Sequence, residues 1–215
     1  MPFSEEKYNE IISYLREKNV ILVAVSKFQS VEEIKKAYDA GIKDFGENYI
    51  QELLPKYELL PKDINWHFIG HLQTNKVKYI TPFIHLIQGV DSLKLLTELN
   101  KQARNNNRKV DCLLQVHIAE EKTKFGFDKK DLLKIEADNF PNVNIKGIMG
   151  MATFTDDENI ISTEFSILKK ISNDLLLKIP TANILSMGMT ADYKIAIDNG
   201  SNMVRIGSLI FGNRI

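Results

Sequence analysis

The feature that most constrains this fold is a regular alternation between short apolar runs and longer segments of helical period. Eight runs rich in strand-forming residues occur, at 20–25, 43–46, 65–69, 84–88, 110–118, 145–149, 183–186 and 203–206. Strand–helix alternation without a break in composition predicts one parallel α/β domain, and eight such units are the number that closes a barrel. We therefore expect a single (β/α)₈ barrel over residues 1–215. The alternative is an open doubly wound sheet, which usually has fewer strands.

Helix signals lie between these runs. Ser30 and Glu33 have capping-box spacing and Gly41 stands where a terminating glycine belongs, so 30–40 should be helical. Other helices are expected at 49–60, 92–105, 158–178 and 192–199, and an extra amphipathic helix at 4–18 precedes the first strand. The most loop-like segment, 119–126, follows the fifth run.

Composition excludes several classes of function. Basic and acidic residues both total 28, so the net charge of zero gives no electrostatic reason to expect nucleic acid or an anionic membrane as a partner. The single cysteine, Cys112, lies in an apolar run and is expected to be a buried hydrophobe. The polar start of the chain is no secretory signal, and no apolar run approaches a membrane span. We expect a cytoplasmic protein.

Chemistry in this fold is expected where strands end. The first run, 20–25, is followed by Ser26 and then Lys27. Apolar walls at a barrel mouth disfavour an ammonium ion, which makes such a lysine a candidate Schiff-base amine. The structural alternative is a solvated loop lysine. After the second run, Asn48 could offer its amide to a ligand or cap the next helix, and both interpretations stay open.

Two histidines, His67 and His71, lie on the third run and its exit. They are four residues apart but not on a helix, so a zinc pair is not expected, and no clustered cysteines or carboxylates supply further metal ligands. His85 and His117 are isolated in the sequence. No complete P-loop or G-x-G-x-x-G fingerprint occurs.

The strongest local signal lies after the last two runs. Ser186, Gly188 and Thr190 follow the seventh, and Gly207 and Gly212 follow the eighth. Small hydroxyl residues and glycines before helix N-termini form the usual phosphate site of such barrels, and two ordinary glycine turns are the alternative. Inside the eighth run, Arg205 needs an acceptor if it points into the barrel, and a ligand could supply it.

These residues lie in six longer motifs, which occur in order along nearly the whole chain. They are AVSK at 24–27, FGENYIQE at 45–52, WHFIGHLQTNK at 66–76, KGIMGM at 146–151, LSMGMTADYKIAI at 185–197 and GSNMVRIGSLIFG at 200–212. With them the chain resembles the pyridoxal phosphate homeostasis proteins, and its fold resembles the barrel domain of bacterial alanine racemases. The segment 120–127 matches only loosely.

The resemblance implies a pyridoxal 5′-phosphate (PLP) cofactor held as a Schiff base by Lys27. It places Asn48 near the cofactor ring and Arg205 opposite the pyridine nitrogen. The phosphate would be bound by Ser186, Gly188, Met189, Thr190, Gly207 and Gly212. Thr190 stands where serine is often found, which preserves the hydroxyl.

The function this implies is a carrier that maintains intracellular vitamin B6 without catalysis and hands PLP to apo-enzymes. Arg205 would discourage protonation of the ring nitrogen, and a neutral ring is a weaker electron sink. The chain lacks the second domain that supplies one base in the similar racemases, so a monomer is expected. A PLP-dependent amino-acid racemase is the first alternative. A Schiff-base aldolase acting on a sugar phosphate is the second.

Overall fold

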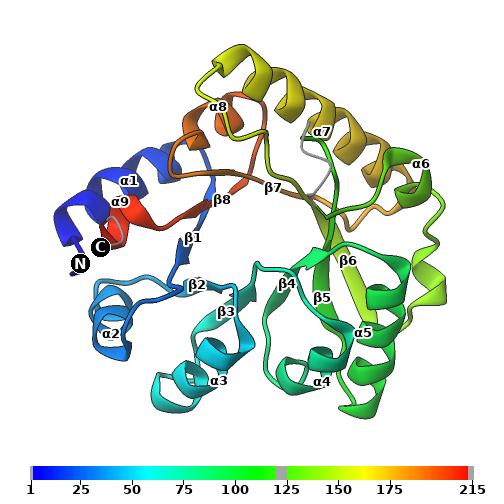
Figure 1. Cartoon of the computed structure of the whole chain (residues 1–215), viewed down its shortest axis with the longest axis horizontal. Helices are drawn as coiled ribbons and strands as arrows, with labels where there is room; N and C mark the ends of the chain where they lie inside the picture. The colour runs from blue at the N-terminus through cyan, green and yellow to red at the C-terminus, as the bar shows by residue number, and fades with distance from the viewer. Residues whose placement is uncertain (1, 120–124, 213–215) are drawn as a thin grey trace.

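The computed structural model describes residues 2–119 and 125–212. Its eight strands are all parallel, and each pairs with the next until β8 pairs with β1, which closes a barrel (Figure 1). The strands are β1 (Ile21–Val25), β2 (Asp44–Glu47), β3 (Asn65–Phe68), β4 (Leu86–Val90), β5 (Val110–Gln115), β6 (Val143–Met149), β7 (Ile184–Met189) and β8 (Met203–Ile206). The predicted (β/α)₈ barrel is confirmed.

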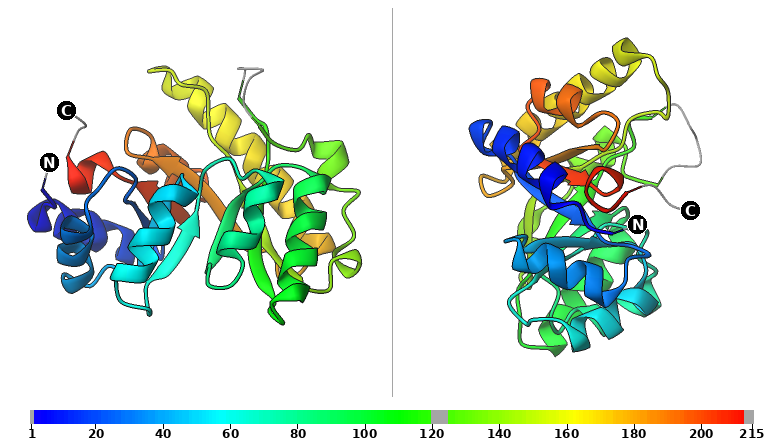
Figure 2. Two further views of the ribbon diagram at one scale, coloured as in Figure 1. Left: turned by 60° about the horizontal axis from the view of Figure 1, so that its bottom comes forward. Right: turned by 90° about the vertical axis from the view of Figure 1, so that its left-hand side faces the viewer.

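Helices surround this barrel on its outer face (Figure 2). They are α1 (Glu5–Glu17), α2 (Val31–Asp39), α3 (Ile50–Leu59), η1 (Thr74–Lys76), α4 (Val77–Ile80), α5 (Leu93–Asn105), α6 (Lys129–Leu132), η2 (Ala137–Asn139), α7 (Glu158–Lys178), α8 (Tyr193–Asp198) and α9 (Ser208–Phe211). The extra N-terminal helix is α1, and it lies beside α9, where the Ser4 amide donates to the Ile210 carbonyl. No helix in the described ranges is long and apolar enough to cross a bilayer.

Helix starts follow the capping chemistry that the sequence indicated. The Ser30 hydroxyl accepts the Glu33 amide at the start of α2, as predicted. Ser4, Ser92 and Asp157 cap α1, α5 and α7 in the same way. Each cap satisfies an amide that has no partner within its helix.

Several strand boundaries differ from the prediction. β4 begins and ends two residues later than the run at 84–88, and Gly89 continues the strand beyond the end of that run. A Cβ at Gly89 would lie 2.5 Å from the Gly70 carbonyl, so this glycine allows the loop after β3 to approach. β7 likewise continues through Gly188 to Met189, with a register shift against β8. β5 ends early, at Gln115, and Val116 forms only an isolated bridge to Phe127.

Most of the apolar core lies between the strands and the helices. There Trp66 is buried against Phe45, with ring centroids 6.0 Å apart, and Cys112 is fully buried as predicted. Burial raises the pKa of the Cys112 thiol, which makes it unreactive. A smaller apolar cluster forms a second layer and consists of Val23, Leu86, Leu113, Met149 and Met203.

Candidate functional site

A cavity of about 520 Å³ lies at the carboxyl ends of β1, β7 and β8. Six of the nine predicted site residues line it, namely Lys27, Met189, Thr190, Arg205, Gly207 and Gly212. Val25, Gln29, Phe154, Ala191 and Ser208 complete the lining. The structure therefore brings an amine, a guanidinium and the two glycine-containing loops to one mouth of the barrel.

The residues on either side of Lys27 are held by buried hydrogen bonds. Lys27 itself is half-buried and is the second residue after β1. The Ser26 hydroxyl donates to Glu47 Oε1 at 2.6 Å, and the Ser26 carbonyl accepts from Lys56 Nζ at 2.9 Å. The Phe28 amide donates to Glu52 Oε2 at 2.6 Å. The backbone that carries the Lys27 amine is thus fixed from both sides.

Glu47 and Lys56 form a buried ion pair beneath this segment. Lys56 Nζ lies 2.8 Å from Glu47 Oε1 and 3.1 Å from Glu52 Oε2. Burial raises the pKa of Glu47, and the charge of Lys56 opposes that rise. The sequence reasoning missed this cluster. Its signals were a glutamate ending an apolar strand and a lysine four residues after Glu52 on α3.

One hydrogen bond joins the two predicted phosphate loops, and a second one lies within the loop after β7. The Gly207 amide donates to Thr190 Oγ1 at 3.4 Å, and the Met189 amide donates to Asp192 Oδ1 at 2.6 Å. A Cβ at Gly207 would lie 3.2 Å from the Val25 Cβ and carbonyl oxygen. A glycine there therefore lets the β8 exit pack closely against β1.

Gly188 does not line the cavity but shapes the β7 exit. Its φ is +96°, and a Cβ would lie 2.6 Å from the Ala196 Cβ on α8. Both observations require glycine, because an L side chain would be strained and would meet α8. The residue sets where the loop of Met189 and Thr190 begins.

Arg205 reaches the cavity from inside the barrel. Its Nη1 donates to Ser186 Oγ at 2.7 Å and its Nη2 to the Gly150 carbonyl at 3.1 Å. Burial lowers its pKa to about 10, and the charge of Asp192 opposes that shift, so the guanidinium stays charged at neutral pH. Within residues 2–119 and 125–212, Arg205 forms no ion pair with a carboxylate. Its charge can therefore serve an acceptor on a ligand.

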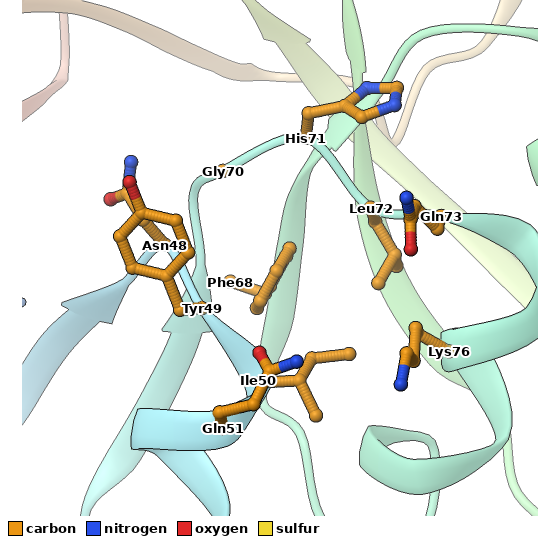
Figure 3. A pocket seen from close by; sticks show the side chains of 10 residues that line it. All are labelled: Asn48, Tyr49, Ile50, Gln51, Phe68, Gly70, His71, Leu72, Gln73 and Lys76. Atoms are coloured by element: carbon orange, nitrogen blue, oxygen red, sulfur yellow. The ribbon is translucent and has the colours of Figure 1, made fainter.

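Besides Gly188, two further predicted residues do not line this cavity. Ser186 is fully buried, and its hydroxyl is engaged by Arg205 and by Gln88 Oε1, at 2.7 Å from the latter. Asn48 lines a neighbouring pocket of about 420 Å³, where it stands with Tyr49 across from Gln73 and Lys76 (Figure 3). Tyr49 also lines this pocket, and the centroid of its ring lies 5.5 Å from that of Phe28, the residue after Lys27.

The Asn48 side chain does not cap the next helix. The N-cap of α3 is Tyr49, and no side chain bonds to the helix start. The Asn48 Oδ1 atom is buried and has no hydrogen-bond partner among the described residues. A buried acceptor of this kind fits a donor supplied by a bound molecule.

The histidines separate into two places. His71 Nδ1 lies 2.8 Å from Asp91 Oδ2, and its ring stacks on Phe125 at the barrel mouth. His67 points into the barrel, where its Nε2 lies 3.0 Å from Asp44 Oδ1. His85 lies beside His67, a proximity that sequence spacing did not indicate, because the two residues belong to neighbouring strand starts.

The fold and site define a barrel with a lysine, a buried arginine and glycine-containing loops at its carboxyl mouth. Residues 5–214 match the family model "Alanine racemase, N-terminal domain", which gives the class of protein. An alanine racemase from Bartonella henselae superimposes with a TM-score of 0.73 at 17% identity, covering 97% of this chain and 59% of that one. At such identity the likeness shows the fold alone.

Relatives at higher identity give the particular family. The pyridoxal phosphate homeostasis proteins of Aquifex aeolicus and Schizosaccharomyces pombe are 38% and 37% identical, over 90% and 92% of this chain and 86% and 85% of theirs. PipY of Synechococcus elongatus, solved without and with PLP, superimposes with TM-scores of 0.92 and 0.84 at 31% and 32% identity. These alignments cover 97% and 94% of this chain and 99% of PipY. The chain belongs to the pyridoxal phosphate homeostasis protein family, as its motifs predicted.

Proposed function

We propose that this chain binds PLP as a Schiff base on Lys27 and maintains intracellular vitamin B6, without turnover of its own. One observation carries the proposal: Lys27, Arg205 and the loops after β7 and β8 line a single cavity. PLP has three functional groups that match them, an aldehyde, a pyridine nitrogen and a phosphate. The names of the relatives and the PLP-bound PipY structure support the same cofactor.

Each part of the cavity has a proposed role. The Lys27 amine would hold the aldehyde group of the cofactor as a Schiff base. Thr190 and the backbone of Met189, Gly207 and Gly212 would surround the phosphate. Gly188, predicted with them, would act by setting where their loop begins. Asn48 offers its unpaired oxygen near the ring. Ser186, predicted beside the phosphate, is placed to support this site by holding Arg205.

Arg205 argues against transamination and leaves either racemisation or a carrier without turnover. A guanidinium opposite the pyridine nitrogen disfavours its protonation, and a neutral ring stabilises a carbanion less well. The other parts of the proposal are a monomeric, cytoplasmic protein whose whole chain forms one binding domain. Its partners would be PLP and apo-enzymes that receive it.

Borohydride reduction tests the Schiff base directly. We expect the PLP-loaded protein to be yellow and to carry, after reduction and proteolysis, a phosphopyridoxyl group on Lys27. The variant Lys27→Ala should lose both the colour and the adduct. An adduct on Lys76 or Lys194 in the unaltered protein would contradict the assignment, and a colourless protein would favour the aldolase.

Exchange of the α-proton separates the carrier from the racemase. Loaded protein is incubated with L-alanine and L-serine in deuterated water and followed by NMR. A carrier should show slow or no exchange, yet restore activity to an added PLP-dependent apo-enzyme. Rapid exchange with inversion, lost in Lys27→Ala, would establish the racemase instead.

A further inference from the structure

A chain of buried polar side chains crosses the barrel interior from the cavity to the opposite rim. Arg205 Nη1 lies 2.7 Å from Ser186 Oγ, which lies 2.7 Å from Gln88 Oε1. Gln88 Nε2 lies 3.1 Å from His67 Nδ1, and His67 Nε2 lies 3.0 Å from Asp44 Oδ1. We call these five residues the polar column. It connects β8, β7, β4, β3 and β2.

The hydrogen bonds of the polar column run in one direction. Arg205 can only donate, so the Ser186 oxygen accepts from it and the Ser186 hydrogen goes to Gln88 Oε1. The Gln88 amide nitrogen then faces His67 Nδ1, which accepts. His67 Nε2 therefore carries a hydrogen and donates to the Asp44 carboxylate. A cation at the cavity and an anion at the far rim thus terminate one ordered chain.

Such a column is an unusual filling for a barrel. Arg205, Ser186, Gln88 and His67 are each at most 4% exposed. Barrel interiors are usually filled by layers of branched apolar residues, which cost no desolvation of polar groups. Apolar packing would stabilise this interior at least as well. The position of the column, with one end lining the cavity, indicates a role in ligand binding.

We propose that Gln88, His67 and Asp44 are positioning residues that fix the Arg205 guanidinium for the pyridine nitrogen of the bound cofactor. Among the described residues, Arg205 has two acceptors, Ser186 Oγ and the Gly150 carbonyl. The Ser186 oxygen faces Arg205 because its hydrogen is engaged by Gln88. Without Gln88, the Ser186 hydroxyl is free to rotate, and the Arg205 guanidinium loses an acceptor of fixed orientation. The inference rests on the proposed function of the cavity.

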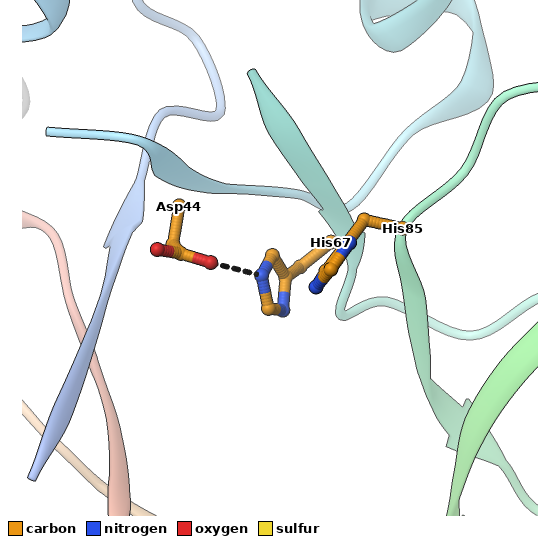
Figure 4. Close-up of side chains that lie close together, drawn as sticks. All are labelled: Asp44, His67 and His85. Carbon is orange, nitrogen blue, oxygen red and sulfur yellow. Dashed lines mark hydrogen bonds and ion pairs between the residues drawn. The ribbon is translucent and has the colours of Figure 1, made fainter. Parts of the chain in front are cut away.

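The far end of the column has another interpretation, a metal site. Ligand atoms of Asp44, His67 and His85 lie within 4.8 Å of one another, and the two imidazole rings are adjacent (Figure 4). Burial, and then the neighbouring His67, lowers the pKa of His85. The donor direction opposes a metal, because His67 Nε2 presents its hydrogen to Asp44. If His67 Nε2 bound a metal, its hydrogen would have to move to Nδ1, and Gln88 would have to accept it there. The side-chain oxygen of Gln88 already accepts from Ser186.

The test compares variants that break the column with one that preserves it. Gln88→Met and His67→Leu remove the bonds, whereas the amide of His67→Gln can accept from Gln88 and donate to Asp44. Asp44→Asn removes only the charge, at a half-buried rim position where folding is least at risk. Leu113→Met, in the apolar layer of the interior, is the packing control. Each is measured for PLP affinity, visible circular dichroism of the bound cofactor and thermal midpoint.

We expect Gln88→Met and His67→Leu to bind PLP about tenfold more weakly, the effect of losing one charge-assisted hydrogen bond. Their cofactor dichroism should change as well, because the ring is held less uniquely. His67→Gln should restore both properties, and Leu113→Met should alter neither. Asp44→Asn should give a smaller loss of the same kind.

Wild-type affinity and dichroism in Gln88→Met, His67→Leu and Asp44→Asn, with only the thermal midpoint lowered, would show that the column is merely structural. A different outcome is that Zn²⁺ raises the thermal midpoint of the unaltered protein but not of His85→Ala. That result would contradict the assignment of a hydrogen to His67 Nε2. Failure of the proposed function is distinguishable, because the wild-type protein would then bind no PLP at all.

Discussion

Lys27 is held in place by neighbouring residues to which the sequence analysis assigned no role. Ser26 and Phe28 are held by Glu47 and Glu52, and Lys56 joins the two carboxylates. Glu47 is fully buried, and its Oε2 has no hydrogen-bond partner within the described structure. Lys56 therefore compensates a buried charge as well as holding the Ser26 carbonyl.

Lys56→Met should lower the free energy of unfolding by roughly 3–5 kcal/mol, because it leaves the Glu47 carboxylate buried without its cation. The double variant Glu47→Gln/Lys56→Met should recover part of this loss. Urea unfolding of both variants measures the difference. Equal stability of the single and double variants would contradict the assignment.

The same pair predicts a pH dependence. The pKa of Glu47 is already raised by burial, and removing Lys56 raises it further. A group with a raised folded-state pKa contributes stability that is present below its unfolded pKa and lost as pH rises through the folded one. The loss of unfolding free energy in Lys56→Met, relative to the unaltered protein, should therefore shrink as the pH falls below the folded-state pKa of Glu47. Unfolding at several pH values tests this, and Glu47→Gln/Lys56→Met should show a weaker trend.

At the scale of elements, the junction of β7 and α8 determines the cavity wall. Gly188 allows α8 to pack against the strand at the residue before the loop of Met189 and Thr190. Gly188→Ala should cost roughly 2–4 kcal/mol, combining backbone strain with a clash against Ala196. Adding Ala196→Gly should remove the contact with Ala196, but neither the 3.0 Å approach to the Tyr193 Cα nor the backbone strain, so stability should return only in part. Full recovery of stability in the double variant would show that alanine adopts the positive φ of position 188 without a cost in free energy.

Element prediction from sequence was accurate where capping and periodicity agreed. Ser30, Glu33 and Gly41 defined α2 to within a residue or two. Two of the errors fell where a glycine allows a close approach of a neighbouring element. Gly89 and Gly188 continue their strands, and only the neighbouring loop or helix explains them. Residues that become neighbours only in the folded chain cannot be identified from a local sequence pattern.

The candidate site was predictable in its outline. Lys27, Thr190, Arg205 and the glycines were identified from strand ends and motifs, and they share a cavity. The polar column was missed because Gln88 and Ser186 are 98 residues apart and meet only when the barrel closes. Contacts across a closed barrel depend on strand order and register, which residue type alone does not give.

For the whole molecule, the phosphate should provide much of the binding energy. Losing about two charge-assisted hydrogen bonds, at roughly 1.5 kcal/mol each, should weaken binding by about 100-fold when pyridoxal replaces PLP. Equilibrium titration with each form measures the ratio. Lys27→Ala should still prefer PLP to pyridoxal, although it can no longer attach either covalently. Equal affinities for PLP and pyridoxal in the unaltered protein would exclude the phosphate loops as the main binding site.

The buried tryptophan gives this barrel an internal optical reporter. Trp66 is the single tryptophan of the sequence, and it lies on β3 directly before His67 of the polar column. Indole emission overlaps the absorption of a pyridoxal Schiff base, so energy transfer from Trp66 would quench its fluorescence as the cavity fills. Loading and release of the cofactor could then be timed without any label, in the same sample used for transfer to an acceptor enzyme that has no tryptophan.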